Sequence, residues 1–212
     1  MHGWIQKLWK SRISSSAPRE QEAKVTELIS NSASSSSPSL STSPAKPPQP
    51  GLSSLPRWRR KYDVLVCHSA EHRDVNEASR LVSFLEASPR SLRCFLMQRD
   101  ACPGGAISTE LCQAVQDSHL RALLITPDFL RDDWCQYMMH QVLSEGPMSN
   151  RIIPLVQDLS HSEYPPELRF YYYINLGGDR ASGYARVTMA VLKYFEDLDK
   201  NEKTLEEQHG QP

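Results

Sequence analysis

Three features are missing from this chain of 212 residues, and each absence excludes a class of protein. Its 24 basic and 25 acidic side chains nearly cancel, so it lacks the positive excess of proteins that bind nucleic acids. Its longest apolar runs are far shorter than the roughly 18 residues that a membrane span needs: Val64–Cys67, Ala122–Ile125 and Tyr171–Ile174. It also lacks an apolar stretch of signal-peptide length near its start, which predicts a cytosolic protein.

The cysteines lack the pattern of disulfide frameworks and of zinc sites. Their number is odd, they are unevenly spaced, and no Cys-x-x-Cys pair occurs among them: Cys67, Cys94, Cys102, Cys112 and Cys135. Cys67 and His68 are neighbours on a predicted strand and therefore point to opposite faces. We predict free, mostly buried thiols in a reducing compartment, with no metal and no cofactor, and we keep Cys67 and Cys102 as candidate redox-sensitive thiols.

Large apolar residues are scarce over residues 20–56, where serine and proline dominate. Between Ser30 and Ser54, eleven of 25 residues are serine and five are proline. Such a stretch buries too little apolar surface to offset the entropy lost on ordering. We predict a flexible linker, whose serines are either phosphorylation sites or parts of a passive spacer.

From Tyr62 onward, short apolar runs alternate with segments of helical periodicity. The runs predict strands at Tyr62–Cys67, Leu92–Leu96, Leu120–Thr126, Ile152–Val156 and Phe170–Ile174. Pro154 cannot donate a ladder hydrogen bond, so we expect its strand at an edge of the sheet.

Four helices are predicted between and after these strands. Asp74 and Glu77 have the spacing of a capping box for the first helix, which ends before Pro89. The second covers Ile107–Val115, and the third covers Trp134–Val142 and is stopped by Gly146-Pro147. The last is Gly183–Leu198, followed by a charged tail over residues 199–212 that we expect to fray. Strands that alternate with helices predict an α/β fold, with a parallel, flavodoxin-like β-sheet flanked by helices on both faces.

Three stretches together resemble one known family. They are Tyr62–Ser69, Arg99–Gly105 and the Thr126-Pro127-x-Phe129-Leu130…Trp134-Cys135 segment, which are similar to box 1, box 2 and the following conserved segment of Toll/interleukin-1 receptor (TIR) domains. The third family box, a Phe-Trp pair, is missing, and Phe170-Tyr171-Tyr172-Tyr173 stands in that region. The resemblance covers residues 57–198 and implies a docking module of intracellular signalling, similar to the adapters of the family.

The second of these stretches is the predicted partner-binding loop. Its proline and glycines favour a stiff, projecting turn, and a preorganised loop loses little entropy on docking. In TIR domains, the corresponding loop contacts partner TIR domains. An ordinary connection between strand and helix is the alternative. The loop consists of Arg99, Asp100, Ala101, Cys102, Pro103, Gly104 and Gly105.

Some TIR domains cleave NAD, so an enzyme is the alternative function. The resemblance implies that such enzymes carry a glutamate on the third helix, four residues after its tryptophan. In this chain, Trp134 is followed at that spacing by Met138. A thioether supplies neither a base nor a negative charge, so we predict a non-catalytic protein.

The first nineteen residues combine tryptophans with basic side chains and contain no acidic residue. On a helix, apolar residues gather on one side and lysines on the other, the arrangement of an interfacial helix on anionic lipid; a tail without fixed structure is the alternative. The predicted membrane-binding residues are Trp4, Ile5, Lys7, Leu8, Trp9, Lys10 and Arg12. A second basic cluster around Trp58, at Arg57–Lys61, is either a further membrane contact or a solvated entry to the domain.

A short motif precedes the last predicted strand. Pro165, Glu167 and Phe170 fit the Pro-x-Glu-x-x-aromatic pattern that tumour-necrosis-factor-receptor-associated factors recognise. Because Phe170 overlaps the predicted strand, burial of its ring is the alternative.

The resemblance implies an adapter of innate immunity that leads to inflammatory signalling. Its expected partners are the TIR domains of activated Toll-like receptors, the myeloid differentiation primary-response adapter, the receptor-associated factors above and a phosphoinositide-rich membrane. We expect homo- and hetero-oligomers through TIR–TIR contacts and no nucleic acid. The expected location is the cytoplasm, peripherally at the inner face of the plasma membrane and at endosomes.

Overall fold

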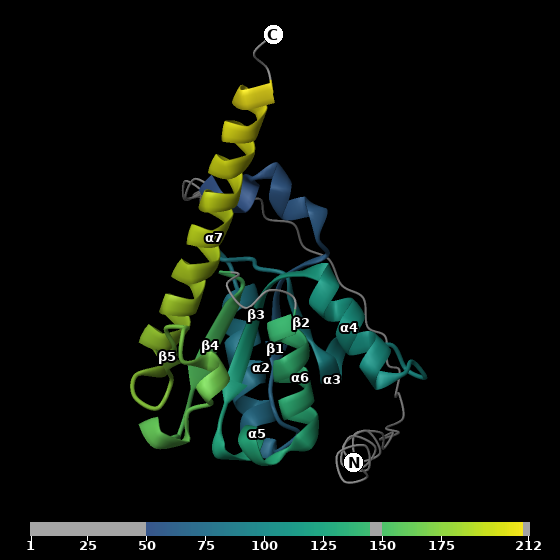
Figure 1. The fold of residues 1–212 in the computed structure, drawn as a ribbon, viewed down its shortest axis with the longest axis vertical. Coiled ribbons are helices and arrows are strands. Elements are labelled where there is room, and N and C mark those ends of the chain that lie inside the picture. The colour runs from purple at the N-terminus through teal and green to yellow at the C-terminus, as the bar shows by residue number, and fades with distance from the viewer. Residues whose placement is uncertain (1–49, 145–149, 210–212) are drawn as a thin grey trace, which may run out of the picture.

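A central sheet of five parallel strands organises the chain, of which a computed structural model describes residues 50–144 and 150–209 (Figure 1). The strand order is β2-β1-β3-β4-β5, the flavodoxin-like form of the doubly wound fold. The predicted parallel sheet is confirmed. The strands are β1 (Tyr62–Cys67), β2 (Cys94–Leu96), β3 (Ser118–Ile125), β4 (Ile152–Val156) and β5 (Ile174–Asn175).

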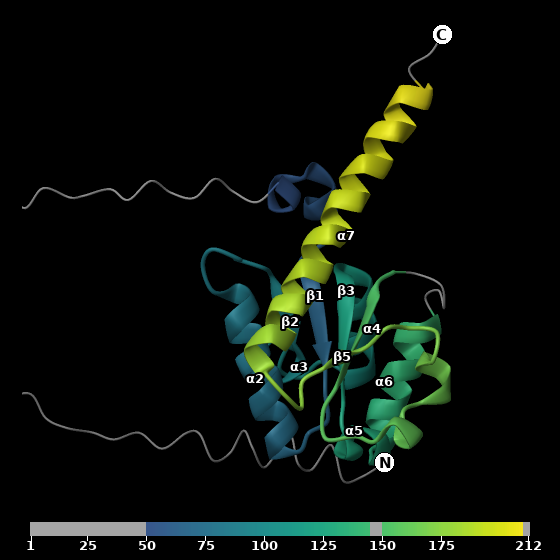
Figure 2. The same ribbon diagram turned by 90° about the vertical axis from the view of Figure 1, so that its left-hand side faces the viewer.

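Helices cover both faces of this sheet, as the two perpendicular views show (Figures 1 and 2). One face packs against α2 (His72–Glu86) and α7 (Arg180–His209). The other packs against α4 (Ile107–Asp117) and α6 (Asp133–Ser144). The remaining helical turns are η1 (Pro50–Ser53), η2 (Leu55–Arg59), α3 (Met97–Asp100), α5 (Pro127–Arg131), η3 (His161–Glu163) and η4 (Pro166–Leu168).

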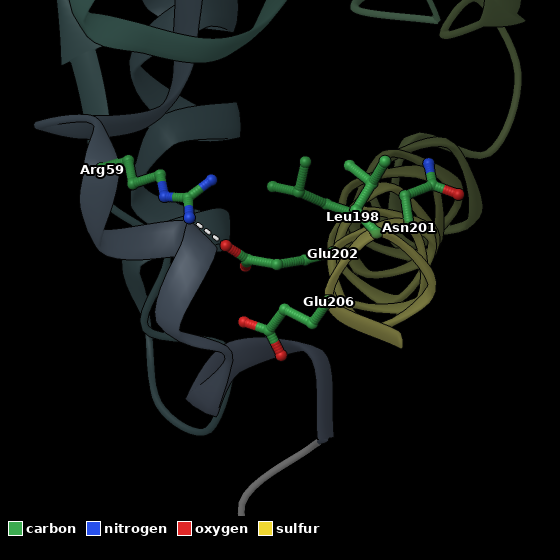
Figure 3. Close-up of a pocket in the computed structure, with 6 residues that line it drawn as sticks. Arg59, Leu198, Asn201, Glu202 and Glu206 are labelled. Atoms are coloured by element: carbon green, nitrogen blue, oxygen red, sulfur yellow. Dashed lines mark hydrogen bonds and ion pairs between the residues drawn. The ribbon is translucent and has the colours of Figure 1, made fainter. Parts of the chain in front are cut away.

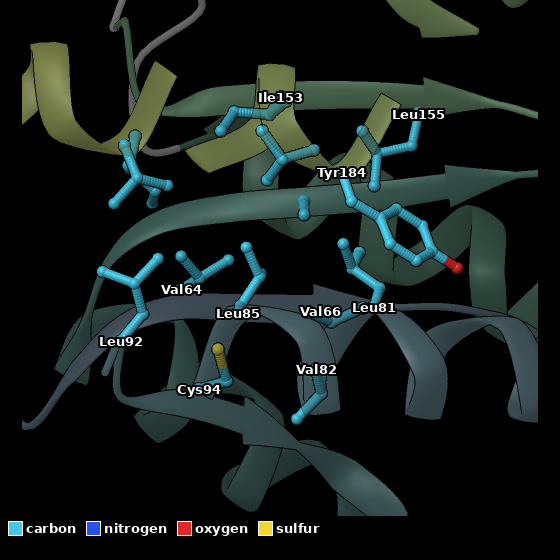
Figure 4. Packing of buried hydrophobic residues seen from close by; sticks show 14 of the residues in the cluster. Val64, Val66, Leu81, Val82, Leu85, Leu92, Cys94, Ile153, Leu155 and Tyr184 are labelled. Carbon is cyan, nitrogen blue, oxygen red and sulfur yellow. The ribbon is translucent and has the colours of Figure 1, made fainter. Parts of the chain in front are cut away.

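Strand β1 divides its side chains between the two helical layers. Val64 and Val66 belong to the core beneath α2 and α7, which Figure 4 shows from close by. Leu65 and Cys67 belong to the core beneath α4 and α6. Successive side chains of a strand point to opposite faces, so a run that is apolar throughout is buried on both sides. Each large aliphatic side chain that is fully buried contributes about 1.5–3 kcal/mol.

The predicted capping box is wrong. Helix α2 begins at His72, and its N-terminus has no side-chain cap. Asp74 and Glu77 lie inside the fold, 4% and 3% exposed. Glu77 accepts a hydrogen bond of 2.5 Å from the Tyr184 hydroxyl of α7, and Asp74 accepts from two hydroxyls beyond the ends of β1 and β3. Both carboxylates bind hydroxyl groups of other elements, so neither caps the N-terminus of α2.

The predicted edge position of β4 is also wrong, because β4 lies between β3 and β5. Gln157 donates its N–H to the Ile125 carbonyl of β3, and hydrogen bonding alternates along a strand, so the nitrogen of Pro154 faces the β5 side. Strand β5 pairs only with Leu155 and Val156. Pro154 therefore faces the stretch that β5 does not reach, which is why the sheet tolerates it.

Two further element boundaries differ from expectation. The last strand is Ile174–Asn175 rather than Phe170–Ile174, because the residues before it bend away from the sheet. Helix α7 continues beyond Leu198 to His209, through the residues expected to fray. The predicted stop at Gly146-Pro147 and residues 210–212 lie outside the described residues.

The described part of the chain begins before the predicted end of the linker. The turns η1 and η2 pack against α7, and Pro56 and Arg57 are buried. The predicted linker thus overlaps the folded domain from residue 50, and residues 20–49 lie outside the described part.

A buried carboxylate joins η2 to the sheet. Asp63 of β1 is fully buried and accepts hydrogen bonds from the guanidinium groups of Arg57, at 2.5 Å, and Arg93, at 2.6 Å. It also accepts the backbone N–H of Arg93 at 2.9 Å. Burial alone would raise the pKa of Asp63, but the hydrogen bonds from both arginines outweigh it and hold the pKa below its ordinary value.

The first prediction concerns this carboxylate. Asp63→Asn leaves two guanidinium groups without their counter-charge, and we expect the free energy of unfolding to fall by about 3–5 kcal/mol in urea denaturation at neutral pH. The matched control is Asp197→Asn, which removes an exposed partner of Lys193 and should cost less than about 1 kcal/mol.

The pH dependence gives the second half of the test. Because the folded pKa of Asp63 is lowered, its contribution is complete above the ordinary pKa of an aspartate and is lost as pH falls through the folded value. The stability difference between wild type and Asp63→Asn should therefore shrink on acidification. A difference that stays constant, or one no larger than that of the control, would show that the pair does not stabilise the fold.

Candidate protein-docking surface

The predicted partner-binding loop ends in a type II turn. The Gly105 N–H donates to the Cys102 carbonyl at 3.1 Å, and between them Gly104 has a φ of +88°. Pro103 supplies the fixed φ of the second turn position, and a glycine is needed at the third. All four residues from Cys102 to Gly105 are exposed, so the loop presents a stiff turn to solvent.

Glu110, in the first turn of α4, anchors this turn from behind. Its carboxylate accepts the Cys102 N–H at 3.1 Å. A Cβ on Gly105 would lie 2.7 Å from the same carboxylate, so the Glu110 side chain would have to move if any other residue stood at this position. The sequence analysis gave Glu110 no role in the loop; an acid in the helical turn that follows a Pro-Gly-Gly stretch was the available indication.

The other end of the loop is anchored by Arg99 and Asp100. Arg99 forms a two-pronged ion pair with Glu86 of α2, at 2.8 and 2.9 Å, and also donates to the Cys94 carbonyl. The hydrogen bonds that Arg99 donates to Glu86 and Asp100 raise its pKa above the ordinary value. Asp100 accepts the Leu96 N–H at 2.8 Å. These two predicted loop residues therefore hold the stem. Arg99 is exposed there, as are Cys102–Gly105 at the tip of the loop.

Aromatic side chains line a second surface, at the β4–β5 end of the sheet. Phe170 is 89% exposed and Tyr172 is fully exposed. They border a groove of about 350 Å³ whose wall also includes Ile152 of β4 and Arg186 of α7. The sequence analysis assigned this aromatic run to a strand and therefore did not predict the groove.

The motif for receptor-associated factors is only partly accessible. Glu167 and Phe170 are exposed, but Pro165 is buried beside the turn η4. The alternative of a buried Phe170 ring is thus wrong. Recognition of all three residues together would require η4 to open.

Polar side chains at the carboxyl ends of β1 and β3 bind one another. Asp74 accepts hydrogen bonds from Ser69 Oγ at 2.6 Å and Thr126 Oγ1 at 2.5 Å, and burial raises its pKa despite them. Open α/β sheets bind ligands at this edge. Here the network fills the position with its own hydrogen bonds, which stabilise the junction of both strands with α2.

The position that distinguishes the NAD-cleaving members holds a core residue. Met138 of α6 is 3% exposed and belongs to the core beneath α4 and α6. Of the nearby glutamates, Glu110 is engaged by the loop, and Glu145 lies outside the described residues.

The thiols agree with the expectation of buried, free cysteines at three positions. Cys67, Cys94 and Cys135 are buried, Cys112 is partly exposed and Cys102 is exposed. Burial raises the pKa of Cys67 to about 12, which disfavours the reactive thiolate, so only Cys102 remains a candidate redox-sensitive thiol. Within residues 50–144 and 150–209, no cluster of three potential metal ligands occurs.

The basic cluster Arg57–Lys61 is largely used by the fold. Arg57 is buried against Asp63, Arg59 pairs with Glu202 of α7, and Arg60 donates to the Ser118 carbonyl. This cluster therefore serves mainly as the entry to the domain. The predicted membrane-binding residues Trp4–Arg12 lie outside the described residues. In the part of the chain that the structure covers, no helix is both long and apolar enough for a membrane span.

Known proteins similar to this chain share its TIR region. The profile of the TIR domain family matches residues 64–188. The human Toll/interleukin-1 receptor domain-containing adapter protein is 52% identical over 159 residues, which make up 74% of this chain and 71% of that protein. Human Toll-like receptor 6 is 25% identical over 109 residues, 50% of this chain and 13% of the receptor.

Two solved structures share the fold. The TIR domain of the Toll-related receptor TRR-2 from Hydra magnipapillata superposes with a TM-score of 0.52 at 22% identity, covering 61% of this chain and 98% of that domain. A TIR-STING receptor from C. gigas, in complex with 2',3'-cGAMP, gives 0.56 at 21% identity, covering 62% of this chain and 40% of the receptor. With its doubly wound sheet, its box-like loops and these matches, the chain belongs to the TIR domain family.

Proposed function

We propose that this chain is a non-catalytic signalling adapter that joins the TIR domains of activated Toll-like receptors to the myeloid differentiation primary-response adapter. The observation that carries the proposal is the exposed turn Cys102–Gly105, held rigid between the Arg99–Glu86 ion pair and Glu110. A turn fixed before binding loses little conformational entropy on docking. Similarity to a human adapter of this family supports the same role.

The proposed adapter acts at a phosphoinositide-rich membrane, at the inner face of the plasma membrane and at endosomes. The amphipathic, basic sequence around Trp4–Arg12 supports lipid binding through its apolar side and its cations. Receptor-associated factors are a further proposed partner, supported by the exposure of Glu167 and Phe170. Assembly through TIR–TIR contacts would then start inflammatory signalling.

Our second prediction concerns the exposed turn. Pro103→His should leave the fold intact because Pro103 packs against no core, but it should weaken pairing with partner TIR domains about tenfold or more, as expected of a central contact. Pairing is measured by titrating the purified variant against labelled receptor and adapter TIR domains, with circular dichroism as the check on folding. The matched control is Pro166→His, which changes a second exposed proline, at the start of η4, and should pair normally. Normal pairing by a folded Pro103→His variant would remove the turn from the interface.

The third prediction concerns catalysis. Purified protein incubated with NAD should release no nicotinamide above the buffer blank, because buried Met138 offers neither base nor charge. Chromatography of the nucleotide products over time measures this. Steady turnover that is lost on mutating a neighbouring carboxylate would replace the adapter proposal with the enzymatic alternative.

The fourth prediction concerns the membrane. Changing Lys7, Lys10 and Arg12 to Glu reverses the local charge, and changing Trp4 and Trp9 to Ala removes the apolar anchor. Both variants should lose binding to phosphoinositide vesicles, and wild-type binding should weaken as salt rises. A fused lipid anchor should restore signalling to both. Unchanged vesicle binding by both variants would move the lipid contact elsewhere in the chain.

A further inference from the structure

Helix α7 extends far beyond the sheet, passes beside η1 and η2, and projects past them at its C-terminal end (Figures 1 and 2). The protruding part, residues 197–206, contains four acidic side chains and two lysines. Leu205 is 56% exposed there, although it is a large aliphatic side chain. This stretch of α7 therefore combines an exposed apolar side chain with a net negative charge.

A cleft of about 430 Å³ lies between η2 and this part of α7. Leu198 and Leu205 supply an apolar surface, and an ion pair from Arg59 to Glu202 crosses the cleft between η2 and α7. Figure 3 shows the side chains of Glu202 and Glu206 extending from α7 towards η2. Among the described residues, Glu206 forms no ion pair, so its carboxylate can receive a cation. The lining of the cleft thus combines two leucines with two glutamates, of which Glu202 is paired with Arg59.

We propose that the cleft binds the N-terminal segment Trp4–Arg12 of the same chain. The charges are complementary, because this segment carries Lys7, Lys10 and Arg12 and no acid. Its apolar residues, Trp4, Ile5, Leu8 and Trp9, can pack against the two leucines of the cleft. The segment is of suitable size, since nine residues in a helix span about 13 Å, and the eight steps from Leu198 to Glu206 span about 12 Å.

The connection between segment and cleft is long enough and ends in the right place. The described chain starts at Pro50, in the turn η1 that packs directly on α7. From Arg12 to Pro50 there are 38 residues, and a chain of serine-rich composition and this length spans about 35 Å on average. A tether of this kind gives an effective concentration of the order of millimolar, so even a weak contact would be substantially occupied.

The docking has a regulatory consequence, which rests on the proposed membrane-binding role of the same segment. Trp4, Trp9 and the lysines cannot contact α7 and a lipid surface at once. Anionic membrane and the acidic cleft therefore compete for one segment, and the cleft lowers the apparent affinity for membrane by the fraction of time it is occupied. At a membrane rich in anionic lipid, the segment binds the lipid rather than the cleft, and the cleft beside α7 becomes empty.

The experiment uses the full chain and two charge reversals. Glu206→Lys alters the cleft, and Asp197→Lys, nine residues earlier in α7 and outside the lining of the cleft, adds the same charge as a matched control. A carbodiimide joins lysines directly to carboxylates, and peptide mapping of the monomer should find Lys7 or Lys10 linked to Glu202 or Glu206 in wild type and in the control. The yield should fall in Glu206→Lys and at high salt.

Co-sedimentation with phosphatidylcholine vesicles containing phosphatidylinositol bisphosphate supplies the second readout. Glu206→Lys should bind about threefold to fivefold more tightly than Asp197→Lys, the factor that corresponds to one screened ion pair. Equal binding by the two variants together with absent cross-links would overturn the docking, and equal binding with cross-links present would overturn the competition.

The remaining outcomes separate this inference from the proposed function. If no variant binds vesicles, the membrane role fails, while the cross-links still decide the docking. Cross-links between two chains instead of within one, found in a covalent dimer, would show that the cleft takes a second copy and would overturn the inference.

Discussion

The buried ion pair of Asp63 with Arg57 and Arg93 fixes the relation between the sheet and the segment that precedes it. Arg57 lies in η2, before the first strand, and Arg93 lies just before β2. The Arg57 carbonyl is in turn bound by the ring of His119 at 2.8 Å, whose pKa burial lowers to about 4. One carboxylate thereby holds a non-local segment against two strands. The placement of Arg59, and with it the cleft beside α7, follows from this contact.

The exposed turn Cys102–Gly105 is likewise held in place by charged side chains from other elements. Its stiffness comes from contacts behind it: a fork from Arg99 to Glu86 on one side and Glu110 on the other. The charged residues Arg99 and Asp100 therefore hold the stem of the turn. The exposed residues Cys102–Gly105 are small and uncharged, so the proposed contact with other TIR domains would depend on their shape.

The sequence predicted the elements that depend on periodicity and missed those that depend on distant partners. The strands at Tyr62–Cys67 and Ile152–Val156 were placed correctly, because residues buried on both faces leave unbroken apolar runs. Asp74 and Glu77 were assigned to a local cap, although hydroxyls far away in sequence hold them. The aromatic run at Phe170 was assigned to a strand because β propensity does not report whether a neighbouring strand is there to pair with. Within the site, the loop itself was predictable from its proline and glycines. Glu86 was not, because it lies 13 residues before its partner Arg99, and Glu110 was indicated only by its place in the helical turn after the loop.

The contact between Gly105 and Glu110 couples two positions that are five residues apart. A Cβ at Gly105 would lie 2.7 Å from a carboxylate oxygen of Glu110, so the Glu110 side chain would have to shift. Loss of the carboxylate would in turn free the Cys102 N–H and relax the turn. A substitution at Glu110, in the first turn of α4, would therefore change the shape of the exposed turn while the sequence Cys102–Gly105 stays the same.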